Sequence, residues 1–90
     1  MELGRIIGSV VATQKEESLL SYKLLVVEML EPRKLKSRGV CTVAIDTLGA
    51  GIGDTVLLAM GSAARVLLPV VTPVDAAVVG IVDTVDVEDE

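Results

Sequence analysis

Short valine-rich runs dominate the chain, each too short for a typical helix and bounded by turn-forming residues. β-Branched side chains favour strands because they restrict χ1 and pack well on a pleated surface. Five strands are therefore predicted: Arg5–Thr13, Lys23–Leu30, Val40–Asp46, Thr55–Met60 and Ala77–Val85. Five strands in 90 residues fit an all-β fold, a small closed or nearly closed barrel of the OB type.

One short helix is also predicted, over residues 63–67. Ser62 is suited to cap its first turn, because a serine hydroxyl accepts a hydrogen bond from a free amide at a helix start. Pro69 prevents the helix from continuing.

The predicted strands are apolar on both faces. In Lys23–Leu30, Leu25 and Val27 fall on one face while Leu24 and Val26 fall on the other. Thr55–Met60 and Ala77–Val85 repeat this pattern. One face can fill a barrel, and no long amphipathic helix is available to cover the second. We therefore expect neighbouring subunits to cover it; the alternative is a set of singly exposed aliphatic side chains, which are common.

Composition supports self-association. Hydrophobic residues make up 51% of the chain and aromatic residues only 1%, which excludes intrinsic disorder. A single domain of this length buries only roughly 60% of its unfolded surface. Aliphatic surface is thus left over for a partner, and a second copy of the chain is the simplest one.

The charge balance argues against nucleic-acid binding. Thirteen acidic residues against eight basic ones give a net charge of −5, and the chain lacks Trp and Phe. Nucleic-acid binders need a basic footprint and commonly aromatic platforms for bases. The basic segment Arg33–Arg38 is interpreted as a solvated loop, and the acidic segment Asp86–Glu90 as a solubilising terminus.

Charged residues interrupt every apolar run before it reaches the roughly 18 residues that a membrane helix requires. The first residues do not resemble a secretory signal. Cys41 is the single cysteine and has no intrachain disulfide partner. These observations predict a protein of a reducing compartment, by default the cytoplasm, without membrane association.

The sequence offers little catalytic chemistry. It contains no histidine, which removes the commonest general base and most zinc sites. Cys41 is flanked by Val40, Thr42 and Val43, without an activating partner, and is predicted to be a small buried side chain. Four aspartates at strand ends and turns are expected to bind backbone amides rather than a metal: Asp46, Asp54, Asp75 and Asp83. No enzyme activity, metal or cofactor is expected.

The glycine-rich segment Gly49-Ala50-Gly51-Ile52-Gly53 is not a nucleotide-binding loop. It lacks the Lys-Ser/Thr of a P-loop, and a strand pattern follows it in place of the helix that would hold phosphate. We interpret it as a tight turn, where glycine supplies a positive φ or allows another backbone to approach closely.

Several motifs together resemble one family. The opening segment is GRIIGSVVATQKEESLLSYKLLVVE, the central one is AIDTLGAGIGDTVLLAMGSAAR, and PVDAAVVGIVDTV leads into the acidic end. In this order they resemble the pentameric vertex proteins of bacterial microcompartment shells, of the EutN/CcmL type. The basic Pro32–Arg38 segment departs from the family pattern and leaves the type of compartment open.

The resemblance implies a single domain over residues 1–86 with an acidic tail at 87–90. It implies an OB-like barrel that forms homopentamers and closes a cytoplasmic shell of hexameric proteins, without catalysis. We expect the turn Gly49–Gly53 to lie beside the central opening or a subunit contact, and the segment Ser62–Arg65 to cap a barrel end. Structural roles are expected for these residues of the motifs: Asp46, Ser62, Arg65, Asp75 and Asp83. The alternative is an OB-type module that binds nucleic acid or a small ligand.

Overall fold

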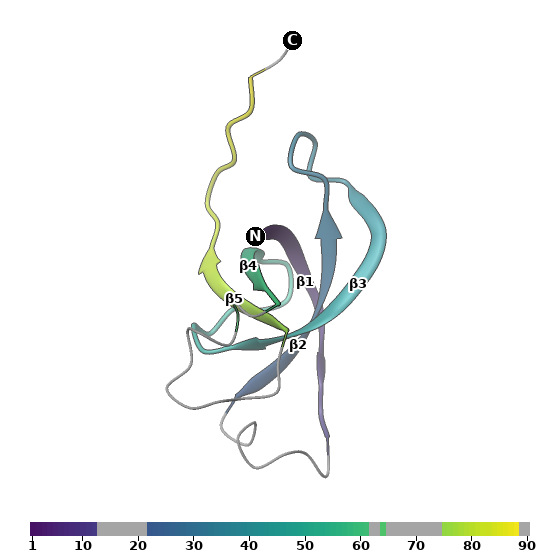
Figure 1. Ribbon diagram of the computed structural model, residues 1–90, viewed down its shortest axis with the longest axis vertical. Helices are drawn as coiled ribbons and strands as arrows, with labels where there is room; N and C mark the ends of the chain where they lie inside the picture. Colours follow the sequence, from purple (N-terminus) through teal and green to yellow (C-terminus); the bar gives the residue numbers. More distant parts are fainter. Residues whose placement is uncertain (13–21, 62–63, 65–74, 89–90) are drawn as a thin grey trace.

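The computed structural model describes residues 1–12, 22–61, 64 and 75–88 (Figure 1). Five strands account for most of them: β1 (Glu2–Val10), β2 (Lys23–Leu30), β3 (Ser37–Asp46), β4 (Thr55–Met60) and β5 (Ala76–Ile81). They form one closed barrel in the order β1-β2-β3-β5-β4. The β3–β5 pair is parallel and the other four pairs are antiparallel. The predicted all-β, five-stranded barrel is confirmed.

Strand pairing decides where the strands begin and end. β1 begins at Glu2, before the predicted Arg5, because residues 2–5 pair with β4. β3 begins at Ser37 because the hairpin with β2 continues to the pair Leu30↔Ser37, past the predicted start at Val40. β5 ends at Ile81, the last residue that pairs with β4, and not at Val85.

The barrel interior is a closely packed aliphatic core. Its completely buried side chains include Val27 of β2, with Val56 and Leu58 of β4. Ala50 joins the same cluster from the glycine-rich segment between β3 and β4, with no exposed surface. The inner and outer faces predicted for β2 are correct, since Leu25 and Val27 are buried and Leu24 and Val26 are only partly covered.

A second, smaller cluster lies on the outer face of the sheet. Ile45, Ala59, Ala64 and Ala77 are buried there, with Tyr22, Leu24 and Val79 packed against them. The chain itself therefore covers part of the outer face that we expected neighbouring subunits to cover. Ala64 is the described residue that reaches this cluster from the segment between β4 and β5, and its amide donates to the Gly61 carbonyl (3.2 Å).

The predicted helix over 63–67 falls almost wholly outside the described residues, as do Ser62 and Arg65. None of the described residues belongs to a helix long and apolar enough to cross a lipid bilayer.

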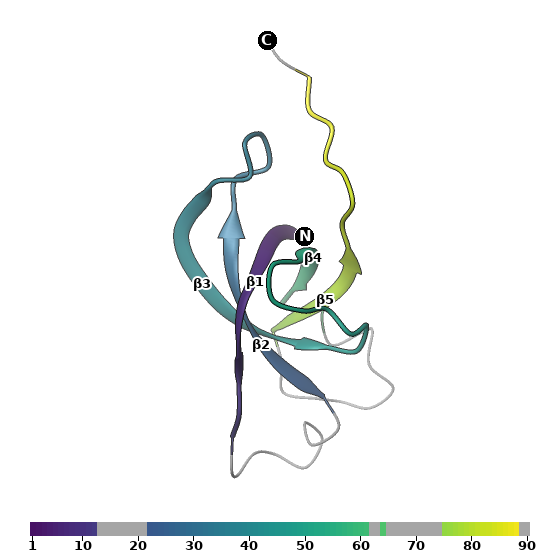
Figure 2. The same ribbon diagram turned by 180° about the vertical axis from the view of Figure 1, so that it is seen from behind.

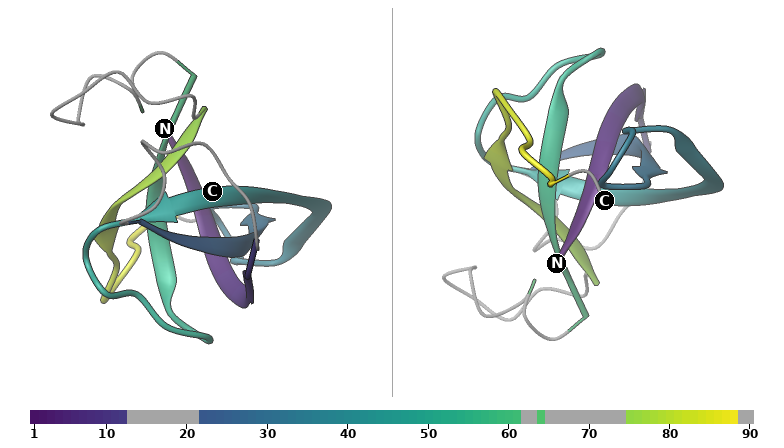
Figure 3. Two further views of the ribbon diagram at one scale, coloured as in Figure 1. Left: turned by 90° about the horizontal axis from the view of Figure 1, so that it is seen from below. Right: turned by 90° about the horizontal axis from the view of Figure 1, so that it is seen from above.

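The molecule is elongated, with principal extents of 47 × 24 × 21 Å. The far end of the β2–β3 hairpin and the chain after β5 both extend beyond the barrel on the same side (Figures 1 and 2). Views along the long axis show the strands wound around the barrel interior (Figure 3).

Candidate functional site

The turn after β3 is organised by the carboxylate of Asp46, which is only 3% exposed. Oδ1 accepts a hydrogen bond from the amide of Leu48 (2.9 Å), while Oδ2 accepts from the amides of Gly49 (3.1 Å) and Ala50 (2.8 Å). A carboxylate that binds successive amides folds the backbone around itself. This arrangement directs Ala50 into the barrel core.

The second half of the turn is fastened by Asp54 and β1. Asp54 Oδ2 accepts from the amide of Gly51 (2.8 Å), and the amide of Asp54 donates to the Gly51 carbonyl (3.0 Å). Gly53 donates to the Ile6 carbonyl (2.9 Å), and Ile6 donates back to the Asp54 carbonyl (3.0 Å). Both sides of the turn are thus fixed to the barrel.

The glycines of this turn have different roles. Gly49 (φ 84°) and Gly53 (φ 92°) adopt the left-handed conformation that glycine tolerates without strain. Gly51 does not have a positive φ, and a Cβ added there would meet only Asp54 Oδ2, at 3.9 Å. The need for a positive φ therefore does not explain Gly51.

The turn displays apolar side chains to solvent. Ile52 is 76% exposed and Leu48 is half-exposed. The Asp46 and Asp54 hydrogen bonds fix the backbone at Leu48 and on both sides of Ile52, so these two residues keep their places on the surface of the turn. Such a position suits contact with another protein surface.

The remaining predicted motif residues are not gathered at this turn. Asp75 and Asp83 are exposed, and their carboxylates make no hydrogen bond with the described part of the chain. The Asp75 main-chain carbonyl accepts from the amide of Gly61 (2.7 Å), which joins the ends of the segment between β4 and β5.

The prediction that Cys41 is buried was wrong, because its thiol side chain is exposed. Ala44 of the same strand belongs to the barrel core, so alternation along β3 places Cys41 on the outer face, opposite Glu28 of β2. No group of three or more potential metal ligands occurs among the described residues.

An apolar patch remains uncovered on the outer face of β1, β2 and β3. Ile7 (45%), Val10 and Val43 (48%) are exposed, and Val26 lies half-buried opposite Val43 in the β2–β3 pair. Val40, Ile81 and Val87 add further exposed aliphatic surface elsewhere. Contiguous apolar surface on a small domain indicates a protein contact.

The basic segment forms the loop of the β2–β3 hairpin. The carboxylate of Glu31 accepts hydrogen bonds from the amides of Arg33 (2.7 Å) and Lys34 (2.8 Å), which lowers the pKa of Glu31. Arg38 forms an ion pair with Glu2 of β1 (2.9 Å) at the base of the loop. The cationic side chains are exposed, as predicted for a solvated loop.

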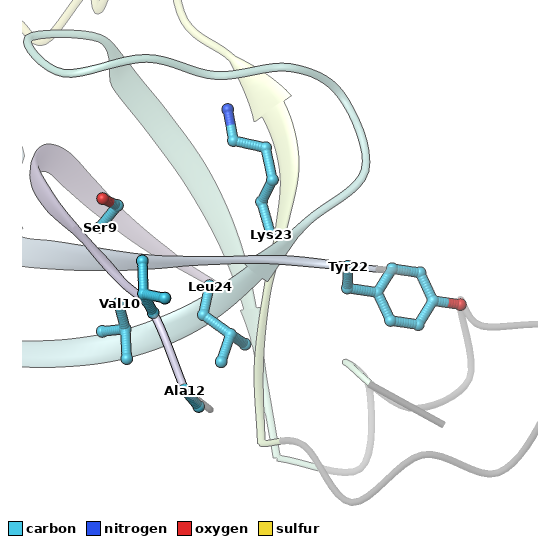
Figure 4. A pocket seen from close by; sticks show the side chains of 7 residues that line it. Ser9, Val10, Ala12, Tyr22, Lys23 and Leu24 are labelled. Atoms are coloured by element: carbon cyan, nitrogen blue, oxygen red, sulfur yellow. The ribbon is translucent and has the colours of Figure 1, made fainter. Parts of the chain in front are cut away.

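A hollow of about 320 Å³ opens between the end of β1 and the start of β2 (Figure 4). Its lining is mixed: Ser9, Val10, Val11, Ala12, Tyr22, Lys23 and Leu24. The ammonium group of Lys23 donates to the Ala50 carbonyl (3.4 Å), so it serves the glycine-rich turn. This lining contains no histidine, cysteine or carboxylate.

Comparison with known proteins decides the family. The family described as "Ethanolamine utilisation protein EutN/carboxysome" matches residues 1–83. The chain belongs to the EutN/CcmL family. Among characterised members, it is 51% identical over 87 residues to the bacterial microcompartment shell vertex protein GrpN of Rhodospirillum rubrum, covering 96% of this chain and 97% of that protein. It is 46% identical over 86 residues to the shell vertex protein EutN of Escherichia coli, covering 94% and 90%.

Solved structures of EutN/CcmL proteins superimpose on nearly the whole chain. The pentameric GrpN shell protein from Rhodospirillum rubrum has a TM-score of 0.88 at 49% identity, covering 99% of this chain and 100% of that one. The CcmL structure from Gloeobacter violaceus has a TM-score of 0.89 at 40% identity, covering 98% and 91%. The predicted family is therefore confirmed.

Some features of this EutN/CcmL chain were missed by sequence reasoning. The role of Ala50 as a core residue was one, because a glycine-rich segment gives no periodic signal. The exposure of Cys41 was another, although counting alternate positions back from Ala44 predicts it.

Proposed function

We propose that this chain forms a homopentamer that occupies the vertices of a polyhedral bacterial microcompartment shell. The observation that carries this proposal is the full-length match to the pentameric GrpN shell protein, in both sequence and fold. The uncovered patch of Ile7, Val10 and Val43 supplies apolar surface for the contact between subunits. A ring uses heterologous contacts, in which one face of a subunit meets a different face of its neighbour.

A vertex role follows from geometry. A flat sheet of hexagonal tiles does not close on itself, whereas five-fold positions introduce the curvature that a polyhedron needs. Hexameric shell proteins are therefore the proposed neighbours of the pentamer, in a shell within the cytoplasm. Its role is structural and not enzymatic, because the sequence has no histidine and the turn and the hollow hold no catalytic constellation.

The alternative of an OB-type binding module receives less support. The net charge is −5, and the exposed cations are concentrated on one hairpin loop with no aromatic platform beside them. Nucleic acid and membrane are accordingly not among the proposed partners.

Native mass spectrometry at micromolar concentration is expected to give a closed pentamer as the main species, because burial of the apolar patch stabilises the ring. A mainly monomeric protein would contradict the proposed ring. A closed hexamer would retain the subunit contact but exclude the vertex role.

Deletion of the gene in its host is expected to leave hexagonal sheets or elongated, leaky compartments, visible by thin-section electron microscopy. Shell tiles still assemble, but no five-fold unit closes them. Re-expression of the intact chain is the control. Normal closed shells in a host without another vertex protein would disprove the proposal.

We further propose that the turn Gly49–Gly53 lies beside the central opening of the ring or at the adjoining subunit contact. A Gly51→Val substitution is expected to dissociate the ring or narrow its opening, although within the subunit a Cβ at this position meets only Asp54 Oδ2, at 3.9 Å. Native mass spectrometry and a crystal structure measure the two outcomes. A Gly51→Val pentamer with an unchanged opening would place the turn away from both.

A further inference from the structure

One side of β3 is largely unpaired. β3 pairs with β2 at Ser37 and from Cys41 to Asp46, with an irregularity between these two stretches. On its other side β3 pairs with β5 only at Ile45 and Asp46. Within the described ranges, no strand pairs with that side of residues 37–44, so this part of β3 is a free edge. Free edges are templates for strand addition, because their main-chain donors and acceptors lack a strand partner.

The segment after β5 is the complementary feature. The amide of Val82 donates to the Thr55 carbonyl (2.8 Å), and beyond it residues 83–88 run away from the barrel without pairing to any described strand (Figures 1 and 2). Val85 and Val87 alternate with polar neighbours in Thr-Val-Asp-Val-Glu, which is the pattern of a strand with one apolar face. We call residues 83–88 the tail.

Charge also matches the tail to the β2–β3 hairpin. The tail carries Asp83, Asp86 and Glu88, while the loop that leads into β3 exposes Arg33, Lys34 and Lys36. Within the described part of its own chain the tail makes a weak contact, a hydrogen bond from Arg33 Nη1 to the Glu88 carbonyl at 3.4 Å. Neither Val85 nor Val87 is buried in the subunit. Most of the tail is therefore free to contact another molecule.

We propose that the tail of one subunit adds as a strand to the free edge of β3 in a second copy of this chain. The inference rests on the proposed ring. Among the described residues, each subunit carries one such unpaired side of β3 and one tail, so a head-to-tail ring pairs every β3 edge with a tail. Main-chain hydrogen bonds hold a strand added in this way, and the loop cations and tail carboxylates orient it.

Cys41 provides a direct test, because it is the single cysteine and lies exposed on the free edge. Single cysteines are introduced at each position from 84 to 87, which samples both faces of the tail and more than one register. The proteins are oxidised and analysed on non-reducing gels. At least one variant is expected to form a ladder of disulfide-linked species up to a covalent pentamer, while the unmodified chain stays monomeric on the gel.

The matched control combines Cys41→Ser with the same tail cysteine, which leaves one thiol per chain, and it is expected to stay monomeric on the gel. A disulfide-linked dimer of this control would mean that tails contact each other and would overturn the inference. Disulfides confined to single chains would show that the tail folds onto its own subunit, and four variants without any ladder would exclude the contact. If the ladder is absent but native mass spectrometry of these variants still shows pentamers, the inference fails and the proposed ring stands. If native mass spectrometry of the unmodified chain shows monomers, the proposed ring fails as well.

A second measurement does not depend on cysteine geometry. A chain that ends at Val82 keeps the hydrogen bond to Thr55 and loses the tail. Its pentamer is expected to dissociate at a protein concentration at least tenfold higher than the full chain, with an unchanged far-ultraviolet circular dichroism spectrum. Equal dissociation of the two chains would overturn the inference.

Discussion

A Gly4→Ala substitution is expected to destabilise the subunit severely. Gly4 is buried in β1, between Met29 of β2 and Val56 of β4. A Cβ at this position would lie 2.3 Å from Val27 Cγ1 and 3.2 Å from the Glu28 carbonyl oxygen. Val27 has no exposed surface, so its side chain lacks free space to move into.

Overpacking a core commonly costs about 1–3 kcal/mol, and a contact this short belongs at or above the upper end of that range. For a domain of this size, a loss of about 3 kcal/mol lowers the melting temperature by roughly 15 °C. Thermal unfolding followed by circular dichroism at one fixed protein concentration measures it, because dissociation of an oligomer makes the melting temperature depend on concentration.

Gly8→Ala is the matched control on the same strand. A Cβ there would meet Val26 at 3.9 Å, an ordinary van der Waals contact. Its melting temperature is expected to change by only a few degrees. The double variant Gly4→Ala/Val27→Ala removes the clashing methyl and is expected to be more stable than the sum of the single effects predicts. Additive effects would disprove the proposed clash.

Asp46→Ala is expected to have the second largest effect. Its carboxylate accepts hydrogen bonds from the amides of Leu48, Gly49 and Ala50. Hydrogen bonds to a charged group contribute about 1.5–3 kcal/mol each, and a buried amide left without a partner costs about 1–3 kcal/mol. Because the three bonds share one carboxylate and the turn can relax, we expect a net loss of about 3 kcal/mol in the free energy of unfolding.

Urea unfolding of the Asp46 variants checks this expectation, with Asp54→Ala as the control. Asp54 accepts one hydrogen bond, from the exposed amide of Gly51, and its removal is expected to cost about 1 kcal/mol or less. Asp46→Asn keeps an acceptor oxygen and is expected to fall between the two. Equal midpoints for Asp46→Ala and Asp54→Ala would mean that the Asp46 carboxylate does not hold the turn.

The strand positions were predictable because they depend on local sequence. Aliphatic runs bounded by turn-forming residues place β2 and β4 to the residue, and alternation within β2 identifies its inner face. The ends of β1, β3 and β5 were not predictable in the same way. Glu2 joins β1 because β4 lies beside it, and β5 ends at Ile81, its last residue in register with β4, one residue before the hydrogen bond from Val82 to Thr55. Neither event has a local signal.

The glycine-rich turn was predicted as a turn, but its internal organisation was not. The need of Gly49 and Gly53 for a positive φ could be anticipated from residue type. The entry of Ala50 into the core, and the fastening of Gly53 to Ile6, depend on the barrel bringing β1 beside the turn. The local sequence pattern therefore identifies the turn, while contacts between residues distant in sequence decide which of its side chains are buried and which are exposed.

By itself, the sequence determined an all-β aliphatic domain with apolar residues on both strand faces, no histidine, and motifs specific enough to identify its family. Only the tertiary structure decided how the outer face is divided: Ile45, Ala59 and Ala77 are covered within the chain, while Ile7, Val10 and Val43 stay open. It also decided that, in the described part of the chain, residues 37–44 of β3 have an unpaired side and residues 83–88 have no strand partner. The physical reason is that composition and periodicity report which side chains avoid water. Barrel closure and pairing between strands distant along the chain decide which of these side chains are buried within one subunit and which are left for a neighbouring subunit to cover.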